Sequence, residues 1–189
     1  MSTALSIIIP STSFSISSSV RKNSLTFEPV YFTWFKDSVP DQLPVKQVYG
    51  IAFSADNLVV LRIEDGKYKL TGGKPENAET FEETLKREYI EEVNIELEDI
   101  HYLGYLLMED NSDKYAQVRM IAKIKDIYES HIDPATGKVY GRELVAADRV
   151  KDYLKYSDRA GNEMIDDAVQ LAQVRYFQNC SCYGYHFED

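Results

Sequence analysis

The chain has 189 residues, 44% of them hydrophobic, which is enough to form the core of one domain. Its formal net charge of −10 argues against a nucleic-acid polymer as partner, because phosphate backbones are bound by Lys and Arg surfaces. This charge does not exclude small phosphate compounds, since a bound metal ion can supply local positive charge.

Residues 1–44 are expected to form an N-terminal leader. The apolar patch at its start has no basic residue ahead of it and is interrupted by Pro10, which disfavours a secretory signal. No stretch approaches the roughly 20 apolar residues needed to span a bilayer, so we predict a cytoplasmic protein without a membrane partner. For the aromatic stretch 32–35, an edge strand is the plain interpretation. A homodimer contact and a cover over the substrate stay open.

Alternating apolar and aromatic residues predict strands on both sides of one central helix. The strands expected before this helix are residues 30–35, 47–53, 58–63 and 67–70, and those expected after it are residues 100–108, 117–127 and 144–147. Residues 131–142 contain Pro and Gly and predict a polar loop. Two further helices are expected at residues 150–156 and 163–177, where apolar residues recur at helical spacing.

The central helix has recognisable ends. Thr80 and Glu83 form the pattern of a capping box, so the helix is expected to begin at Phe81. Asn94 fits the other end, because Asn readily takes the left-handed conformation that closes a helix. The apolar stripe of this helix consists of Phe81, Leu85, Tyr89 and Val93.

Three carboxylates of this helix share one face, because Glu88, Glu91 and Glu92 are three and four positions apart. Like charges at this spacing repel each other, which favours a cation among them. A solvated acidic helix face is the plain alternative. The carboxylates lie beside the apolar stripe rather than opposite it, which places them at the edge of the core and favours a metal site.

Six residues follow a fixed spacing: Gly73, Glu79, Arg87, Glu88, Glu91 and Glu92. This spacing resembles the Nudix box, which runs Gly, five residues, Glu, seven residues, Arg-Glu, an aliphatic, any residue, Glu-Glu, any residue, Gly, an aliphatic. Tyr89 departs from the pattern at the first aliphatic position and Asn94 at the second glycine. The resemblance implies an α/β (α+β) Nudix fold, a mixed β-sheet sandwiched between helices, over residues 45–177, followed by a tail at 178–189.

The resemblance also implies a metal site and a reaction. Glu88, Glu91 and Glu92 match the metal-binding glutamates of the family, and the carbonyl of Gly72 matches a further ligand. Oxygen ligands suit Mg²⁺ or Mn²⁺. Nudix enzymes hydrolyse compounds in which a diphosphate links a nucleoside, or sometimes another alcohol, to a second group. We therefore expect a pyrophosphohydrolase whose partner is a small nucleotide or diphosphate substrate.

The remaining matching residues orient the site. By resemblance, Arg87 pairs with the metal-binding glutamates, and Glu79 ties down the loop that begins at Gly73. The general base is either Glu88 or a residue outside the box, for which Glu143 is the candidate, with Glu129 behind it. The residues expected to take part in catalysis are therefore Arg87, Glu88, Glu91, Glu92 and Glu143.

The sequence leaves the substrate and two other functions open. The positions downstream of the box that distinguish Nudix subfamilies are uninformative here. A nucleotide-sensing or regulatory domain without turnover is the main alternative, and an inert interaction module is the third. Cys180 and Cys182 are the only cysteines, and we expect free thiols because a zinc site needs about four ligands.

Overall fold

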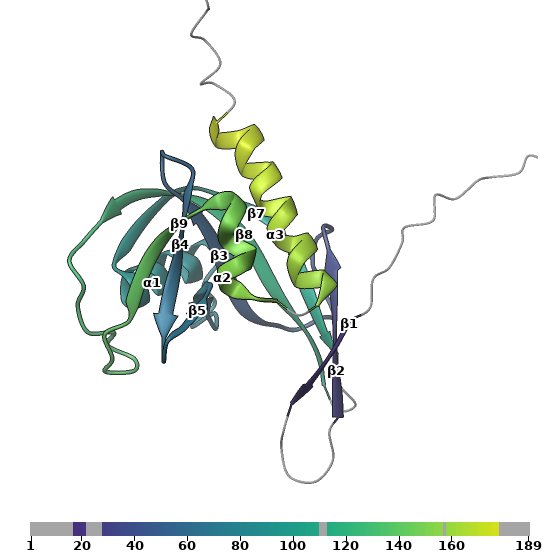
Figure 1. Ribbon diagram of the computed structural model, residues 1–189. Helices are drawn as coiled ribbons and strands as arrows, with labels where there is room; N and C mark the ends of the chain where they lie inside the picture. The colour runs from purple at the N-terminus through teal and green to yellow at the C-terminus, as the bar shows by residue number, and fades with distance from the viewer. Residues whose placement is uncertain (1–16, 22–27, 110–112, 157, 178–189) are drawn as a thin grey trace, which may run out of the picture.

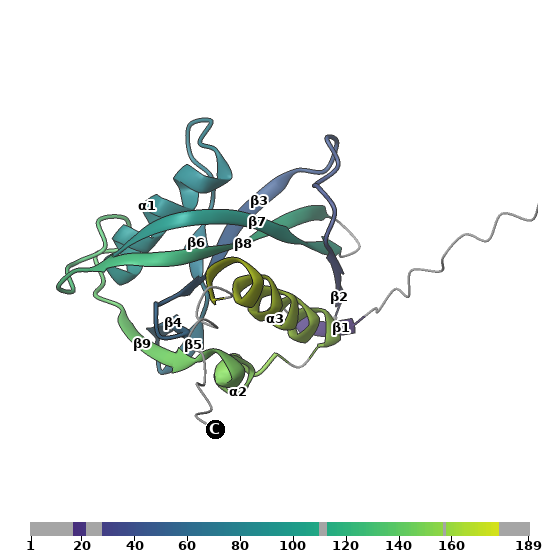
Figure 2. The same cartoon turned by 90° about the horizontal axis from the view of Figure 1, so that it is seen from above.

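The computed structural model describes residues 17–21, 28–109, 113–156 and 158–177. A mixed sheet separates helix α1 (Phe81–Val93) from helices α2 (Val150–Leu154) and α3 (Arg159–Ala172), as Figures 1 and 2 show. This arrangement confirms the predicted α+β fold with a mixed sheet between helices. In the described part of the chain, no helix has the length and apolar character required to cross a bilayer.

The described strands belong to one sheet. In spatial order they are β1 (Ser17–Arg21), β2 (Glu28–Phe35), β7 (Ile95–Glu109), β8 (Lys114–Ile127), β3 (Val45–Phe53), β4 (Leu58–Glu64) and β5 (Lys67–Lys69). Two further strands are β6 (Thr71–Gly73), which pairs with β3, and β9 (Gly141–Ala146), which pairs with β4. The β3–β8 pair is parallel, and the other pairs are antiparallel.

The box helix has the predicted ends. The Thr80 side chain accepts a hydrogen bond from the Glu83 backbone, and the Glu83 side chain accepts one from the Thr80 backbone, which is a complete capping box. At the other end Asn94 is left-handed, with φ 55° and ψ 48°. Its side chain also donates to the carbonyl of Ile90 and accepts from the backbone N–H of His131. Asn94 thus holds the loop before β9, which a glycine side chain could not do.

Several predicted boundaries are wrong. Helix α3 begins at Arg159 rather than at residue 163, because the Asp158 side chain caps it by accepting from the backbone N–H of Gly161 at 2.6 Å. It ends at Ala172 and is followed by a π-helical turn, Gln173–Phe177. Strand β7 begins at Ile95 rather than at residue 100, directly after the left-handed Asn94. Strand β6 was not predicted, and β9 takes in the last two residues of the predicted 131–142 loop. The edge strand of the leader is β1 rather than the aromatic stretch 32–35, because β2 lies between β1 and β7.

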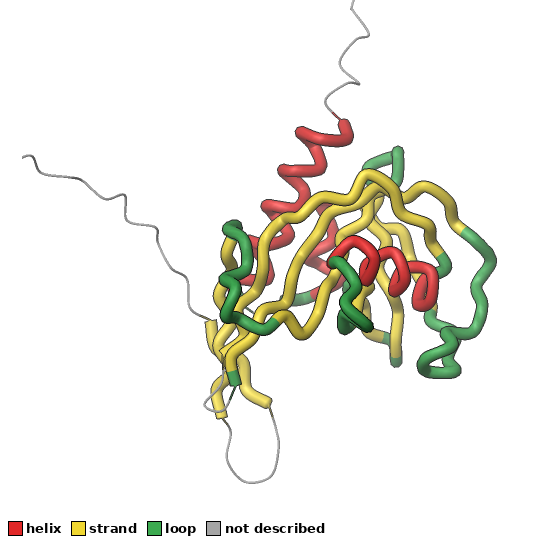
Figure 3. Tube along the Cα trace, turned by 180° about the vertical axis from the view of Figure 1, so that it is seen from behind, coloured by secondary structure: helices red, strands yellow, loops and turns green. Residues whose placement is uncertain are grey.

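Box helix α1 packs on the sheet opposite α3 (Figure 3). Leu85, Tyr89 and Val93 are buried, which confirms the predicted stripe. Tyr89 is larger than the aliphatic residue of the family pattern, and Gly50 on β3 provides the space for it. A Cβ atom added at Gly50 would lie 2.9 Å from the Tyr89 ring and 2.8 Å from a Leu85 methyl. The departure at Tyr89 is therefore accommodated by a glycine in the facing strand.

Candidate active site

Arg87 lies at the centre of the box carboxylates. Its Nε and Nη2 donate to the two oxygens of Glu79 at 2.9 and 3.1 Å. Its Nη1 donates to Glu88 at 2.9 Å and to Glu91 at 3.1 Å. These hydrogen bonds, the one to Glu79 most of all, raise the pKa of Arg87. One guanidinium thus joins three carboxylates through charge-assisted hydrogen bonds.

Glu79 connects the loop to the helix. Besides pairing with Arg87, its carboxylate accepts from the backbone N–H of Glu76 at 3.0 Å and from the Thr84 hydroxyl at 3.0 Å. The hydrogen bonds from Arg87, first, and from the Glu76 backbone lower the pKa of Glu79 to about 2. The carboxylate is therefore charged at neutral pH. It bonds both to the loop backbone at Glu76 and to Arg87 on the helix, and so holds the loop against the helix.

Glu88 lies against the backbone of Gly73. A Cβ atom at position 73 would be 2.2 Å from a Glu88 carboxylate oxygen, so a larger residue there would displace this carboxylate. Burial raises the pKa of Glu88, Arg87 lowers it, and the nearby carboxylates of Glu91 and Asp133 raise it further. The proton affinity of Glu88 is thus shifted in the direction that a general base needs.

Glu92 is held from the sheet side. Its carboxylate forms an ion pair with Arg62 on β4 and accepts from the backbone N–H of Gly72 at 3.2 Å. The side chains of Arg62 and Glu92 are only 11% and 10% exposed. Gly72 has φ +146°, and a Cβ atom there would lie 2.1 Å from the Val48 carbonyl oxygen, so this position also requires glycine.

The donor set fits a divalent cation. Within the described residues, no three acidic, His or Cys side chains are arranged as a ready metal site. The reason is visible in the contacts: Glu88 and Glu91 turn to Arg87, and Glu92 turns to Arg62. These guanidinium groups place positive charge against the same oxygens that Mg²⁺ or Mn²⁺ would use. The carboxylates could hold such an ion after small side-chain movements.

A cavity of about 390 Å³ lies on the side of the sheet that α3 covers, and its link to the box is Arg62 rather than a box carboxylate. Arg62, the ion-pair partner of Glu92, forms part of its wall, together with Tyr49 and Arg119. Its other walls include apolar side chains from β2, β7 and the segment after β5. A compound bound at the carboxylates could extend into this cavity.

A comparison with known protein families identifies the family of this chain. The model of the NUDIX domain matches residues 44–156, which include the box, strands β3 to β9 and α2. The chain belongs to the Nudix family. No curated protein matches the chain.

Solved Nudix structures share the fold. A mutant of the pyrophosphohydrolase RppH of Bacillus subtilis has a TM-score of 0.61 at 19% identity, covering 75% of this chain and 92% of that one. A structure of MutT, described for Aliivibrio salmonicida and Vibrio cholerae, has a TM-score of 0.50 at 16% identity, with 67% and 96% covered. A NUDIX hydrolase of Nitrosomonas europaea has a TM-score of 0.50 at 18% identity, with 66% and 87% covered. These likenesses establish the fold.

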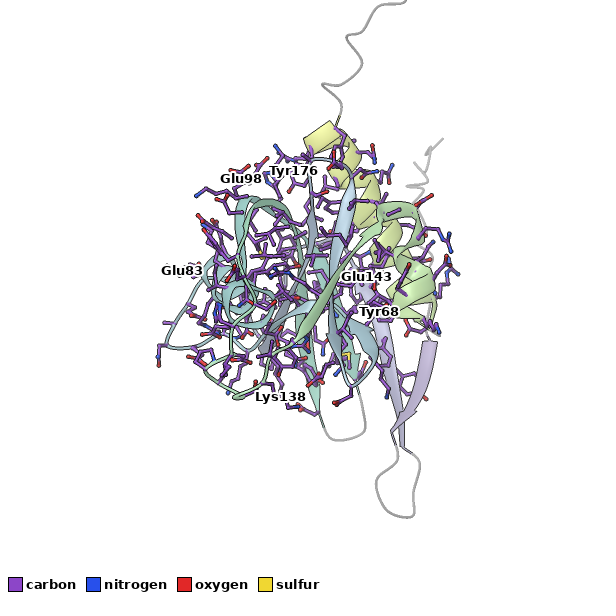
Figure 4. All side chains as sticks on the ribbon, turned by 60° about the vertical axis from the view of Figure 1, so that its left-hand side comes forward. Tyr68, Glu83, Glu98, Lys138, Glu143 and Tyr176 are labelled. Carbon is purple, nitrogen blue, oxygen red and sulfur yellow. The ribbon has the colours of Figure 1, made fainter. Side chains whose placement is uncertain are left out.

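Glu143 lies apart from the Nudix carboxylates. It is on β9 opposite Leu61, and residues opposite each other in an antiparallel pair point to the same face. Leu61 packs in the core cluster on the α3 side, whereas its neighbour Val60 packs in the cluster on the α1 side. The Glu143 carboxylate accepts a hydrogen bond from the Tyr68 hydroxyl at 2.6 Å (Figure 4). The structure therefore does not bring Glu143 to the box.

Two residues near the box were missed in the sequence. Arg62 follows four consecutive apolar residues in β4, and a charge in that position was the available signal. Asp133 is buried, and its carboxylate accepts from Ala135 and Thr136, which closes the turn of the loop before β9. It also acts electrostatically on Glu88. The Asp-Pro pair at 133–134 is a turn signal, but nothing in the sequence relates it to the helix.

Proposed function

We propose that this Nudix protein is a metal-dependent hydrolase that cleaves a diphosphate linkage in a nucleoside diphosphate joined to another group. The observation that carries the proposal is the clustering of Glu88, Glu91 and Glu92 around Arg87 and Arg62, of which Arg62 also forms part of a cavity wall. The RppH relative is a pyrophosphohydrolase, which agrees with this assignment. The cytoplasmic location, a homodimer and the division into leader, domain and tail stay predictions.

The proposed metal ligands are the carboxylates of Glu88, Glu91 and Glu92, with the carbonyl of Gly72 as a further ligand. When bound there, Mg²⁺ or Mn²⁺ would neutralise charge on the diphosphate and lower the pKa of water. The protein's own contribution is orientation. Arg87 fixes Glu88 and Glu91 through one nitrogen, and the Gly72 N–H and Arg62 fix Glu92.

For the proton acceptor we propose Glu88 rather than Glu143. Glu88 is partly buried beside the other carboxylates, and its pKa is raised chiefly by that burial. Glu143 instead lies on the α3 side of the sheet, away from the proposed metal ligands, where its carboxylate accepts a hydrogen bond from Tyr68 of the cavity wall. Glu143→Gln should therefore leave turnover within a few-fold of wild type, whereas Glu88→Gln should reduce it by about 10²-fold or more. A large loss in Glu143→Gln would assign the base to Glu143.

The test of the function is turnover of a panel of nucleoside diphosphate compounds with Mg²⁺ or Mn²⁺. Wild type is compared with Glu92→Gln, which keeps the size of the side chain and removes one charge. Glu82→Gln is the matched control, because Glu82 lies on the same helix, is exposed and pairs only with Lys86 among the recorded ion pairs of the described residues. We expect Glu92→Gln to lower kcat/KM by at least about 10²-fold and Glu82→Gln to leave it unchanged.

A different outcome would favour another function. If wild type binds nucleotides but turns over no member of the panel, the nucleotide-sensing domain replaces the hydrolase. If it binds neither metal nor nucleotide, the inert interaction module does. Melting curves of Glu92→Gln are needed beside the kinetics, because that substitution also removes the partner of Arg62.

A further inference from the structure

Arg119, in the middle of β8, is a buried cation without a carboxylate partner. The residue is 4% exposed, and none of the ion pairs among the described residues includes it. Its Nη1 donates to the Val118 carbonyl at 3.1 Å, and its Nη2 donates to the Gln117 side chain at 2.9 Å. Its Nε is buried and has no hydrogen-bond partner within the part of the chain that the structure describes. Both acceptors are neutral, so the positive charge is not compensated.

A buried guanidinium without a carboxylate partner, such as that of Arg119, destabilises the fold. Burial lowers the pKa of Arg119, and only the neighbouring tyrosines Tyr156 and Tyr49 counter this effect. A guanidinium remains protonated at neutral pH even so. Stacking on the Tyr49 ring, 4.7 Å from the guanidinium carbon, offsets part of the cost of burial. A buried charge held only by neutral groups is otherwise unfavourable, which suggests that an anion belongs beside it.

The position of Arg119 shows where that anion would come from. Arg119 forms part of the wall of the 390 Å³ cavity on the α3 side of the sheet, and Arg62, the partner of Glu92, forms part of the same wall. Tyr49 lies near both Arg119 and the box, because the charges of Arg119, Arg62 and Glu88 all affect the pKa of its hydroxyl. A molecule with its diphosphate at the carboxylates would reach the cavity wall that includes Arg119 if its remaining part extends past Arg62.

The other polar groups of the cavity leave Arg119 available. Asp158 also contributes to the wall, but its carboxylate caps α3 by accepting from Gly161 and forms no recorded ion pair with Arg119 among the described residues. Gln117 is held between Gln47 and Arg119. A neutral group, such as a nucleobase, could accept hydrogen bonds from the guanidinium but would leave its charge uncompensated.

We propose that Arg119 binds an oxyanion, a phosphoryl or carboxylate group, on the part of the substrate that extends beyond the cleaved diphosphate. This inference rests on the proposed function, since it names the class of compound for the same site. The favoured substrate then carries a negative charge in addition to the diphosphate. Arg–phosphate and Arg–carboxylate pairs are the strong, directional contacts expected of a buried guanidinium.

Two variants test the role of Arg119. Arg119→Gln removes the charge, and Arg175→Gln is the matched control, because Arg175 is exposed in the turn after α3 and is not part of the cavity wall. Calorimetric titration of metal-free protein with inorganic phosphate, pyrophosphate and acetate, at constant ionic strength, measures anion binding without turnover. We expect Kd for at least one anion to rise at least tenfold in Arg119→Gln and to stay unchanged in Arg175→Gln. Which anion responds distinguishes a phosphoryl from a carboxylate group.

The melting temperature separates this role from a structural one. Without ligand, Arg119→Gln should melt at or above the wild-type Tm, because it removes an uncompensated buried charge. Arg119→Met, which keeps the packing of the stem, should behave in the same way. A Tm several degrees lower in both variants, or unchanged Kd values for all three anions, would overturn the proposal.

Kinetics connects the anion to the substrate. A nucleoside diphosphate compound is compared with its counterpart carrying one extra phosphate or carboxylate away from the diphosphate. Wild type should favour the charged counterpart at least tenfold in KM, and Arg119→Gln should lose that preference while kcat changes little. If wild type shows no preference, the inference fails while the hydrolase assignment stands. If neither compound is turned over but the Arg119-dependent anion binding persists, the hydrolase assignment fails and the anion site stands.

Discussion

The ion pair between Arg62 and Glu92 joins the sheet to the carboxylate face of α1, and its removal has a definite expected energy. Both side chains are about nine-tenths buried, and breaking such a pair by removing one partner costs about 3–5 kcal/mol. Arg62 keeps a second carboxylate, Glu64, at 3.3 Å, so its charge is not left unpaired in Glu92→Gln. We therefore expect Glu92→Gln to lower the free energy of unfolding by about 2–3 kcal/mol, below the range for a fully orphaned charge.

Urea unfolding of metal-free protein measures this energy. With a slope of about 2 kcal/mol per molar urea, the midpoint of Glu92→Gln should fall by about 1 M. Arg62→Met should cost more, about 3–5 kcal/mol, because it leaves the buried Glu92 carboxylate with the Gly72 N–H alone among the partners recorded in the described residues. The double variant should cost about 1–3 kcal/mol less than the sum of the two, since it removes both charges.

Additivity would refute this reasoning. If the double variant equals the sum of the single variants within about 0.5 kcal/mol, the two side chains do not interact in solution. A second check uses Mg²⁺, which should stabilise wild type but not Glu92→Gln, because binding to the folded state alone raises the free energy of unfolding.

Three further perturbations address the site and the core. Gly73→Ala should reduce turnover at least about tenfold with the secondary structure retained in circular dichroism, because its Cβ would lie 2.2 Å from a Glu88 oxygen and displace that carboxylate. Leu85→Ala should lower the free energy of unfolding by about 2–5 kcal/mol in urea, because the side chain is fully buried under α1. The pKa of Glu79 is lowered by Arg87 from 4.5 to about 2, so its contribution to stability is fully present above pH 4.5 and is lost as the pH falls towards 2. Glu79→Gln should therefore flatten the pH dependence of stability in that window.

Each of these perturbations has a control. Leu144→Ala, at an exposed leucine, should change stability by less than about 0.5 kcal/mol, and a loss in Leu85→Ala no larger than this would contradict the packing of α1. Glu82→Gln should leave the pH dependence of stability between pH 2 and 4.5 unchanged. If Glu82→Gln and Glu79→Gln flatten it equally, the loss of one negative charge causes the effect rather than the loss of the ion pair with Arg87. Full activity in Gly73→Ala would mean that Glu88 does not need its observed position.

The sequence by itself determined the box helix and most of its surroundings. The capping residues, the apolar stripe and the spacing of the glutamates are all local features, since a helix relates residues three and four positions apart without help from the rest of the chain. For the same reason the left-handed Asn94 could be predicted where the family pattern has glycine. Strand positions followed from alternation, although their ends shifted where pairing with a neighbour extended them, as in β7.

Only the tertiary structure decided which residues from other strands meet this helix. Arg62 pairs with Glu92 and Asp133 acts on Glu88 because β4 and the loop before β9 lie beside α1, and sheet order is not encoded in any local pattern. Glu143 illustrates the same limit, because a shift of one position along a strand reverses the face to which a side chain points. Arg119 was visible in the sequence only as a charge within a strand. Its burial without a carboxylate, and hence the anion site, follows from the packing of β3, β8 and α3 around it.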